Sequence, residues 1–402
     1  TTFDVGLITN NELRYSRDTW LGGDWIGHIL SISSVDISSV GAGGGSIAWF
    51  DDGGLLRVGP ESAGALPGPA CYGQGGKLPT VSDAACALGY FDPTFFLGGE
   101  MELDIKAARK AIQPIAKKLN RTIEEAAYGI LHLASEVMIN AVRDITITKG
   151  IDPKESIIVA GGGAAGINIM LIAKELGISK VILPKQASAL SACGMQFADL
   201  ISEESISFFT HSKDFNGKAV NSVISRIKKR VEKFRLSLPI EHRRKKYKIE
   251  LSVEARYASQ IWEIDVPVII GDYTKAKTLN KLIQEFHAVH ERLFALRDEG
   301  SIIEFIVWKT RLLVKSGIKL TNKKKQKNNK ILKAVIKNRN CYFGNKKPKK
   351  TKIYKSNNLS VGMKVRGPCI IEEPTTTVVV FPGMSAVVSN DNHYILNCNE
   401  SD

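Results

Sequence analysis

The sequence predicts an α/β protein in which a layered α/β part is followed along the chain by a β-rich α+β part. Two observations carry this prediction. Between residues 156 and 200 the expected order is strand, glycine turn, helix, strand and helix, which is the order of α/β proteins. Between residues 247 and 388, stretches rich in β-branched and aromatic residues predominate, and a single predicted helix interrupts them.

Short strands separated by Gly and Asp turns are predicted for residues 1–58. Leu7–Ile8 and Leu13–Tyr15 flank a turn at residues 9–11, and residues 47–50 and 55–58 form a second hairpin around an Asp-Asp-Gly-Gly turn. A long connection rich in Gly and Pro then runs from Gly59 to Pro79. Structureless loops of this length inside compact domains are usually functional or disordered. Because this connection carries few charges, we expect it to be ordered and therefore functional.

Helices are predicted next, at residues 81–88, 105–119 and 123–149. Thr122 and Glu125 form the pattern of a capping box at the start of the third helix, and Gly150 ends it. An apolar strand at residues 156–160, which we expect to be buried, leads through three glycines into a helix at residues 164–176. A short strand at 181–184 and a helix at 188–200 follow.

The second half of the chain is expected to begin with an amphipathic helix at residues 219–237. The strands predicted after it are 247–257, 262–268, 302–314 and 378–388, and the interrupting helix is 273–296. We place the domain boundary between residues 202 and 218, so that residues 1–203 form one domain and residues 204–402 form a linker helix with a β-rich domain.

Composition excludes several classes of protein. With 402 residues, 44% of them hydrophobic and 24% charged, the chain can bury a sizeable core, so disorder of the whole chain is excluded. The longest uncharged apolar run, residues 157–173, is interrupted by glycines and does not predict a membrane span, and no secretory signal is visible. Six scattered cysteines without a CxxC pair favour a reducing compartment, and we therefore expect a cytoplasmic protein.

The net charge of +14 is unevenly distributed: residues 1–200 carry −5 and residues 201–402 carry +19. The excess lies in the basic runs 226–230, 243–248, 323–330 and 346–352. A nucleic-acid surface is one interpretation, and solvated lysine-rich loops and helix faces are the other. We favour the second, because these runs almost lack the aromatic residues on which bases stack.

Two short segments could bind phosphate. Gly161, Gly162, Gly163 and Ala164 lie at a predicted strand-to-helix junction, where backbone N–H groups and the helix amino end attract anions. The hydroxyls of Thr1 and Thr2 beside a strand could bind a terminal phosphate, and Asp4 could hold Mg²⁺ or orient water. Each has a structural alternative, close packing for the glycines and an ordinary hairpin edge for the first strand.

Other candidate residues have simpler structural explanations. His287 and His290, three residues apart on a predicted helix, could bind a metal, but packing is the better interpretation. Cys71 and Cys193 are possible nucleophiles, although a cysteine of this kind is more often a small buried apolar side chain. Asp83 lies at a helix start, where N-capping accounts for it.

Several longer motifs resemble the ATP-dependent A-type subunit of the hydantoinase/oxoprolinase family. They are GAGGGSIAWFDDGGLLRVGPESAGALPGPACYGQGG with the following PTVSDA, FDPTFFLGGEMELD, IIVAGGGAAG, ALSACG, FHAVHERLF and GPCIIEEPTTTVVVFPG. The opening TTFDVGLI resembles the phosphate loop of that family without the two glycines that normally precede it. Together these motifs span nearly the whole chain.

The resemblance implies the C-terminal lobe of an actin-like, sugar-kinase-like ATPase fold, with ATP and Mg²⁺ as cofactors. It places Thr1, Thr2 and Asp4 near the phosphates, and Gly161 to Ala164 near the nucleoside or phosphates. It also implies that an N-terminal lobe with a first phosphate loop precedes Thr1, so that we expect this chain to be inactive as a fragment. A B-type subunit, similar to hydantoinase B or the carboxylase alpha subunit, is the implied partner.

Three functions remain open at this point. GGGAAGIN, ALSACG and the stretch from Glu304 to Arg311 resemble the ATP-using subunit of acetone and acetophenone carboxylases, which favours phosphorylation of a ketone enol before carboxylation. The first alternative is ATP-dependent hydrolysis of a cyclic amide such as 5-oxoproline or a hydantoin. The second is a truncated, non-catalytic interaction subunit.

Overall fold

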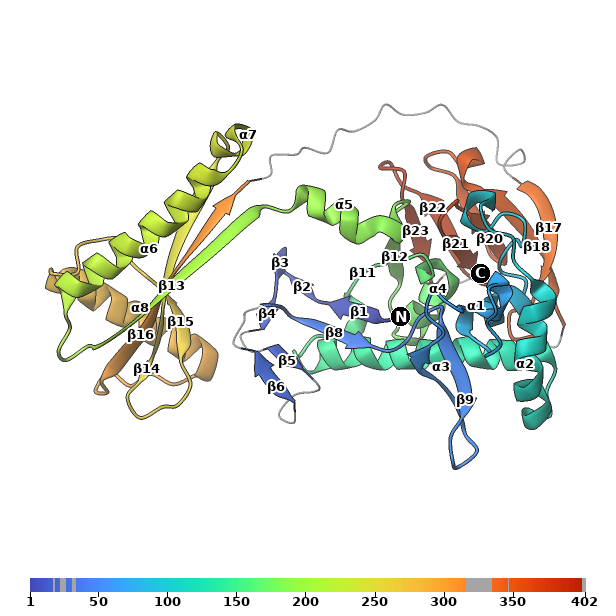
Figure 1. The fold of residues 1–402 in the computed structure, drawn as a ribbon, viewed down its shortest axis with the longest axis horizontal. Helices are drawn as coiled ribbons and strands as arrows, with labels where there is room; N and C mark the ends of the chain where they lie inside the picture. The colour runs from blue at the N-terminus through green and yellow to red at the C-terminus, as the bar shows by residue number, and fades with distance from the viewer. Residues whose placement is uncertain (17–18, 22–26, 31–33, 316–334, 346, 400–402) are drawn as a thin grey trace. The chain divides into compact units, whose positions relative to one another are not determined.

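The computed structural model describes the chain except residues 17–18, 22–26, 31–33, 316–334, 346 and 400–402. By their contacts the residues divide into two compact units, Thr1–Ser191 with Asn322–Asp402, and Ala192–Thr321. Figure 1 shows the elements of both. The first unit is therefore built from both ends of the chain. The predicted boundary between residues 203 and 204 stays a prediction about domain organisation.

The N-terminal part of the first unit consists of small antiparallel pairs. They are β1 (Phe3–Gly6) with β8 (Ile37–Val40), β2 (Ile8–Thr9) with β3 (Glu12–Leu13), β4 (Tyr15–Ser16) with β7 (Ser34–Val35), β5 (Thr19–Leu21) with β6 (His28–Leu30), and β9 (Ser46–Phe50) with β10 (Leu56–Ser62). Both predicted hairpins are present, and β10 runs four residues further than expected, into the Gly/Pro connection.

Helices pack against one another and against these strands. They are α1 (Val81–Ala87), α2 (Ile105–Leu119), α3 (Ile123–Ile147) and α4 (Ala165–Glu175). The capping box predicted for α3 is present: Thr122 Oγ1 accepts from the Glu125 amide at 3.2 Å, and Glu125 Oε2 accepts from the Thr122 amide at 2.9 Å. The buried faces of these helices enter one core together with apolar residues of the C-terminal segment.

The C-terminal segment adds two sheets to the first unit. Its strands are β17 (Val335–Cys341), β18 (Lys349–Lys355), β19 (Lys364–Arg366), β20 (Cys369–Glu372), β21 (Thr377–Val380), β22 (Ser385–Val388) and β23 (Tyr394–Asn397). One sheet has the order β17-β18-β20-β21. The other has the order β11-β12-β23-β22-β19, with β11 (Ile158–Val159) and β12 (Lys180–Leu183), so β23 pairs with a strand more than 200 residues earlier (Figure 1).

Two strand predictions in this unit are wrong. Residues 378–388 form two strands, β21 and β22, because the chain turns at Gly383, whose φ is +75°. The strand predicted at 156–160 has only two paired residues and is not buried: Ile157 and Val159 are 57% and 60% exposed. Its apolar run is exposed because β11 is an edge strand, paired only with β12 among the described residues.

The second unit is an antiparallel sheet with two helices on one face. Its order is β13-β16-β14-β15. The elements are β13 (Leu200–His211), α6 (Gly217–Ser237), α7 (Ile240–Arg243), β14 (Tyr247–Tyr257), β15 (Ile264–Pro267), α8 (Ala276–Phe294) and β16 (Ile303–Val314), and α5 (Leu190–Phe197) contains the boundary between the units. Apolar side chains of α6, α8, β14 and β16 share one core. An α/β unit and a β-rich unit are what the sequence predicts, so the fold class is confirmed.

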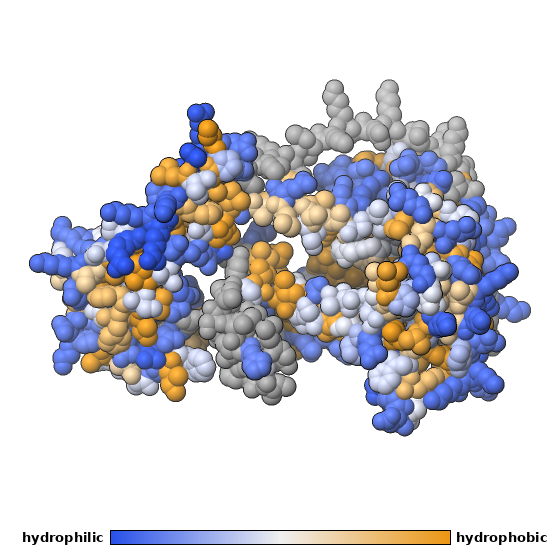
Figure 2. Space-filling view, viewed as in Figure 1, coloured by the Kyte–Doolittle hydropathy of each residue, from blue (hydrophilic) through white to orange (hydrophobic). Residues whose placement is uncertain are grey.

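The described parts of the basic runs lie largely on surfaces. On α6, Ile227 is buried whereas Arg226, Lys229 and Arg230 are exposed, and strongly hydrophilic side chains gather over this helix in Figure 2. Such a pattern is that of an amphipathic helix with a solvated charged face. The run 323–330 and residue 346 lie outside the described residues. None of the described helices is both long enough and apolar enough to cross a membrane.

Candidate nucleotide pocket

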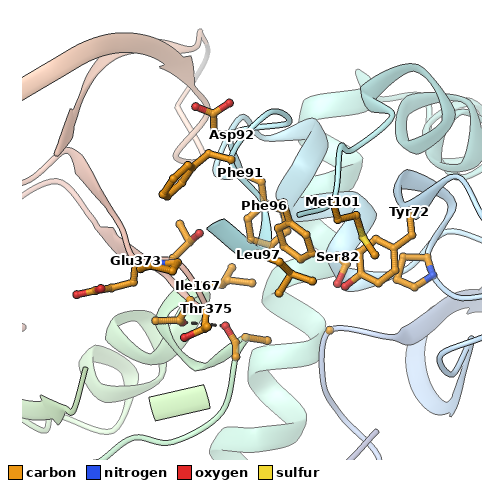
Figure 3. Close-up of a pocket in the computed structure, with 18 of the residues that line it drawn as sticks. Tyr72, Ser82, Phe91, Asp92, Phe96, Leu97, Met101, Ile167, Glu373 and Thr375 are labelled. Atoms are coloured by element: carbon orange, nitrogen blue, oxygen red, sulfur yellow. Dashed lines mark hydrogen bonds between the residues drawn. The ribbon is translucent and has the colours of Figure 1, made fainter. Parts of the chain in front are cut away.

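A pocket of about 330 Å³ lies in the first unit, where segments from several parts of the chain meet (Figure 3). Its walls are the end of the first strand, the glycines before β9, the segment between α1 and α2, the amino end of α4 and the loop between β20 and β21. The lining residues are Thr1, Gly44, Gly45, Gly64, Pro69, Tyr72, Ser82, Phe91, Asp92, Phe95, Phe96, Leu97, Met101, Gly163, Ala164, Ile167 and the six residues from Glu372 to Thr377.

Thr1, two residues before the start of β1, packs directly on the glycines before β9. A Cβ on Gly43 would lie 2.2 Å from Thr1 Cγ2, and a Cβ on Gly45 would lie 3.0 Å from Thr1 Oγ1. The Thr1 hydroxyl also shares a 2.7 Å hydrogen bond with the Ser62 hydroxyl. Only glycine permits this approach, which explains why the sequence runs Gly-Gly-Gly here.

The second glycine turn leads into α4. Gly162 has a φ of +115°, and its amide donates a 2.6 Å hydrogen bond to the Ala187 carbonyl. The Gly163 carbonyl accepts a 2.8 Å hydrogen bond from Thr376 Oγ1. The helix begins without a capping side chain, so its first amides have no side-chain acceptor and its amino end attracts anions.

The two turns meet. A Cβ on Gly44 would lie 3.6 Å from the Ala164 Cβ, so the loop beside Thr1 and the loop before α4 lie close together, with little more than the space of a methyl group between them. Of the residues expected to bind phosphate, Thr1, Gly163 and Ala164 line the pocket. They come from segments about 160 residues apart, and only the tertiary structure brings them to one wall.

The other expected residues lie outside the lining. Asp4 is exposed, and its carboxylate accepts hydrogen bonds from Ser39 Oγ at 2.5 Å and from Thr2 Oγ1 at 3.1 Å. Gly161 packs against Leu190, whose Cδ2 would lie 2.6 Å from a Cβ at that position. Gly162 shapes the turn through its positive φ. No group of three or more His, Cys, Asp and Glu side chains that could hold a metal occurs in the described part of the chain.

Aromatic side chains form another wall of the pocket, which the sequence did not predict. The Phe91 and Phe96 rings lie 5.2 Å apart in an edge-to-face arrangement, and the Tyr72 ring lies 5.6 Å from Phe96. Figure 3 shows Phe96, Leu97 and Met101 grouped beside Tyr72. The motif FDPTFFLGGEMELD supplies most of this wall, and its aromatic density was the signal that could have marked it.

Three acidic residues, Asp92, Glu372 and Glu373, also line the pocket. Glu372 is 3% exposed; Arg339 Nη1 lies 3.1 Å from its Oε1, and its Oε2 has no hydrogen-bond partner among the described residues. Burial raises the pKa of Glu372, and the nearby Arg339 charge opposes this only in part. Burial alone would also raise the pKa of Asp92, but hydrogen bonds from Lys337 and Thr94 hold it below its usual value.

Asp83 has a larger role than the helix start alone explains. It is fully buried, and its two oxygens accept from the Ala70, Cys71 and Thr80 amides and from the Thr80 hydroxyl at 2.7 to 3.2 Å. Thr80 is the N-cap residue, and Asp83 completes a capping box three residues on. Asp83 therefore fixes the Gly/Pro connection to α1, immediately beside the lining residue Ser82.

His287, His290 and Cys71 have structural surroundings, and Cys193 is half-buried in α5 and does not line the pocket. The Tyr257 hydroxyl and His287 Nδ1 are hydrogen-bonded at 2.8 Å, and His290 contacts the Leu296 carbonyl at 2.7 Å. Both histidines are buried in the second unit, so the packing interpretation is confirmed. A hydrogen bond with Cys86, together with burial, raises the pKa of the Cys71 thiol well above its usual value, which does not suit a nucleophile.

The architecture is that of an ATPase-like α/β lobe with a β-rich C-terminal domain, as solved structures of similar proteins show. The structure titled "Mechanism of ATP-Dependent Acetone Carboxylation, Acetone Carboxylase nucleotide-free structure" superposes with a TM-score of 0.85 at 26% identity, covering 100% of this chain and 57% of that one. The crystal structure of ATP-dependent caprolactamase from Pseudomonas jessenii superposes with a TM-score of 0.73 at 31% identity, covering 99% and 57%.

Sequence comparison gives the family. Residues 1–204 match Hydantoinase/oxoprolinase, and residues 210–401 match the Hydantoinase/oxoprolinase C-terminal domain. The chain belongs to the hydantoinase/oxoprolinase family. Caprolactamase subunit alpha of Pseudomonas jessenii is 33% identical over 95% of this chain and 55% of its own length, and 5-oxoprolinase of Saccharomyces cerevisiae is 32% identical over 98% and 31%.

The chain thus spans little more than half the length of the caprolactamase subunit and of acetone carboxylase. The family includes ATP-dependent enzymes, and some relatives, such as caprolactamase subunit alpha, are subunits of larger assemblies. The family expected from the sequence motifs is confirmed.

Proposed function

We propose that the pocket binds ATP and that the complete protein uses ATP to activate a carbonyl oxygen of a small molecule by phosphoryl transfer. The observation that carries this proposal is the close approach of the two glycine turns, with Thr1, Gly163 and Ala164 lining one pocket. Backbone amides at a helix amino end and a hydroxyl at a strand end are groups that bind phosphate. The ATP-dependent relatives support the same ligand.

Each expected residue has a part in the proposed site. Thr1, Gly163 and Ala164 contact phosphate oxygens. Gly161 and Gly162 set the path of the turn, and Thr2 orients Asp4 through their hydrogen bond. Asp4 suits Mg²⁺, because this ion is often held by one or two carboxylates together with substrate phosphates and water, and the Asp4 carboxylate is exposed. Bound Mg²⁺ would neutralise phosphate charge.

For the reaction, we propose ring opening of a cyclic amide. The γ-phosphoryl group passes from ATP to the amide oxygen, which makes the ring carbon a better electrophile. Water then attacks that carbon, the C–N bond breaks and phosphate leaves. The supporting observation is that lactam-opening relatives, a caprolactamase subunit and a 5-oxoprolinase, match 95% and 98% of this chain.

A second candidate is phosphorylation of a ketone enol before carboxylation, as the sequence motifs suggested. The superposition with acetone carboxylase favours it, because its TM-score of 0.85 exceeds the 0.73 of caprolactamase. In either reaction a B-type subunit is the proposed partner, and we propose a cytoplasmic location. The third candidate, a non-catalytic interaction subunit, would not bind nucleotide.

Phosphate release separates these candidates. The full-length protein, purified with its co-expressed partner, is incubated with ATP and Mg²⁺ and with caprolactam, 5-oxoproline, or acetone plus bicarbonate. Release stimulated by a lactam supports ring opening, and release stimulated only by the ketone and bicarbonate together supports carboxylation. If calorimetric titration detects no ATP binding, the proposal is refuted and the non-catalytic candidate remains.

A further inference from the structure

The loop between β20 and β21 holds the glycine turn in place. Thr376 is 6% exposed, and its hydroxyl donates a 2.8 Å hydrogen bond to the Gly163 carbonyl. At the start of β21, directly after this loop, the Thr377 carbonyl packs against Gly166, where a Cβ would lie only 2.3 Å from its oxygen. This loop comes from the C-terminal segment, some 210 residues after the turn.

A turn of three successive glycines does not fix its own peptide orientation. Glycine populates positive and negative φ about equally, so peptide planes in such a turn can rotate at low cost. Two hydrogen bonds from outside restrain this turn: the Ala187 carbonyl accepts from the Gly162 amide at 2.6 Å, and the Thr376 hydroxyl donates to the Gly163 carbonyl. The first restrains the start of the turn and the second restrains its end.

The second contact determines where the next amide points. In a trans peptide the C=O and the N–H point in opposite directions. Because the Gly163 carbonyl is held toward Thr376, the Ala164 N–H is directed away from Thr376. Ala164 is the N-cap residue of α4 and lines the pocket, and helix geometry provides no intrahelical acceptor for amides at this position.

We infer that Thr376 is a positioning residue for ATP, which acts by locking the peptide between Gly163 and Ala164 so that the Ala164 amide is aimed at a phosphate oxygen. This inference rests on the proposed function. Thr376 also lines the pocket, but its hydroxyl hydrogen is already donated to the turn. Its effect on ATP therefore passes through Gly163 and Ala164.

The test compares matched threonine substitutions in the full-length protein, with ATP affinity measured by calorimetric titration. Thr376→Val keeps the shape and removes the donor, and we expect ATP to bind about 10-fold more weakly, as for a lost hydrogen bond to a charged group. Thr376→Ser keeps the donor and should restore affinity to within about twofold of the wild type.

The control is Thr351→Val. Thr351 is also buried and donates its hydroxyl to a backbone carbonyl, that of Lys349 at 2.9 Å, but it lies in β18 and does not line the pocket. If losing a buried hydroxyl has a purely structural effect, that effect would appear as a lower melting temperature of the Thr351→Val protein. Its ATP affinity should equal that of the wild type.

A second measurement needs no variant. Hydrogen exchange of the peptide covering residues 161–166 should slow when ATP is added to the wild-type protein. Unchanged exchange there, wild-type ATP affinity in Thr376→Val, or equal weakening in Thr376→Val and Thr376→Ser would each overturn the inference and leave ATP binding standing. If the wild-type protein does not bind ATP, the proposed function fails first.

Discussion

Two glycines three residues apart, Gly163 and Gly166, should respond in opposite ways to the same substitution. A Cβ on Gly166 would meet only backbone atoms, the Thr377 oxygen at 2.3 Å, the Thr377 carbon at 3.0 Å and the Val378 Cα at 3.1 Å. A Cβ on Gly163 would meet the Thr375 oxygen at 3.5 Å, an ordinary contact distance. The φ of neither residue is positive.

The cost of Gly166→Ala follows from these distances. Backbone atoms cannot rotate away, so α4 and β21 must move apart, and overpacking of this kind costs about 1–3 kcal/mol, with the upper end expected here. Alanine in place of glycine returns at most about 1 kcal/mol in a helix. We therefore expect Gly166→Ala to lower the free energy of unfolding by about 2 kcal/mol.

Gly163→Ala should leave the free energy of unfolding within about 1 kcal/mol of the wild type, because the added methyl group finds space. Gly163 and Thr375 both line the pocket, so the added methyl group narrows it there, and ATP should bind at least about 10-fold more weakly if its phosphates approach the turn. Urea unfolding followed by circular dichroism and calorimetric ATP titration measure the two effects. Wild-type stability of Gly166→Ala would refute the packing argument, and wild-type ATP affinity of Gly163→Ala would refute phosphate binding at this turn.

Three further predictions concern local interactions. Asp83→Asn places an NH₂ group against buried backbone donors, and we expect it to lower the free energy of unfolding by about 3 kcal/mol in urea; a loss below about 1 kcal/mol would contradict the anchoring role. Thr122→Ala removes the N-cap of α3 and should cost about 1 kcal/mol in the same assay, and an unchanged midpoint would contradict it. Burial lowers the pKa of His287, so the unfolded chain binds a proton at this imidazole at higher pH than the folded chain does. The contribution of His287 to the free energy of unfolding should therefore be fully present above about pH 6.5 and should decrease as the pH falls below that value. Unfolding free energies at pH 7.5 and pH 5.5 should differ less in His287→Gln than in the wild type, and an equal difference would contradict this assignment.

Elements defined by neighbouring residues could be predicted. The start of α3 is given by Thr122 and Glu125, which lie within one helical turn, and the bounds predicted for α2 and β14 agree with the structure. The hairpin of β9 and β10 follows from the short connection at residues 51–55, which contains the Asp-Asp-Gly-Gly turn. In each case the interacting groups are a few residues apart, so local spacing contains the information.

Burial and strand partners could not be predicted in the same way. The apolar run 156–160 suggested a buried strand, but exposure of Ile157 and Val159 depends on β11 lying at a sheet edge. The strand predicted at 378–388 turns at Gly383, which apolar composition does not reveal. An edge position and a sharp turn are consequences of which segments pair, and hydrophobicity alone does not specify pairing.

By itself the sequence determined the family, the fold class and the two segments proposed to bind phosphate. It did so because glycines, capping residues and long motifs act locally and can be seen without a partner. Only the tertiary structure decided that Thr1, Ala164 and Thr376 share one pocket, and that β23 completes the sheet begun by β12. Those contacts join residues that lie 160 to more than 200 positions apart, and they form because separate apolar faces are buried in a common core.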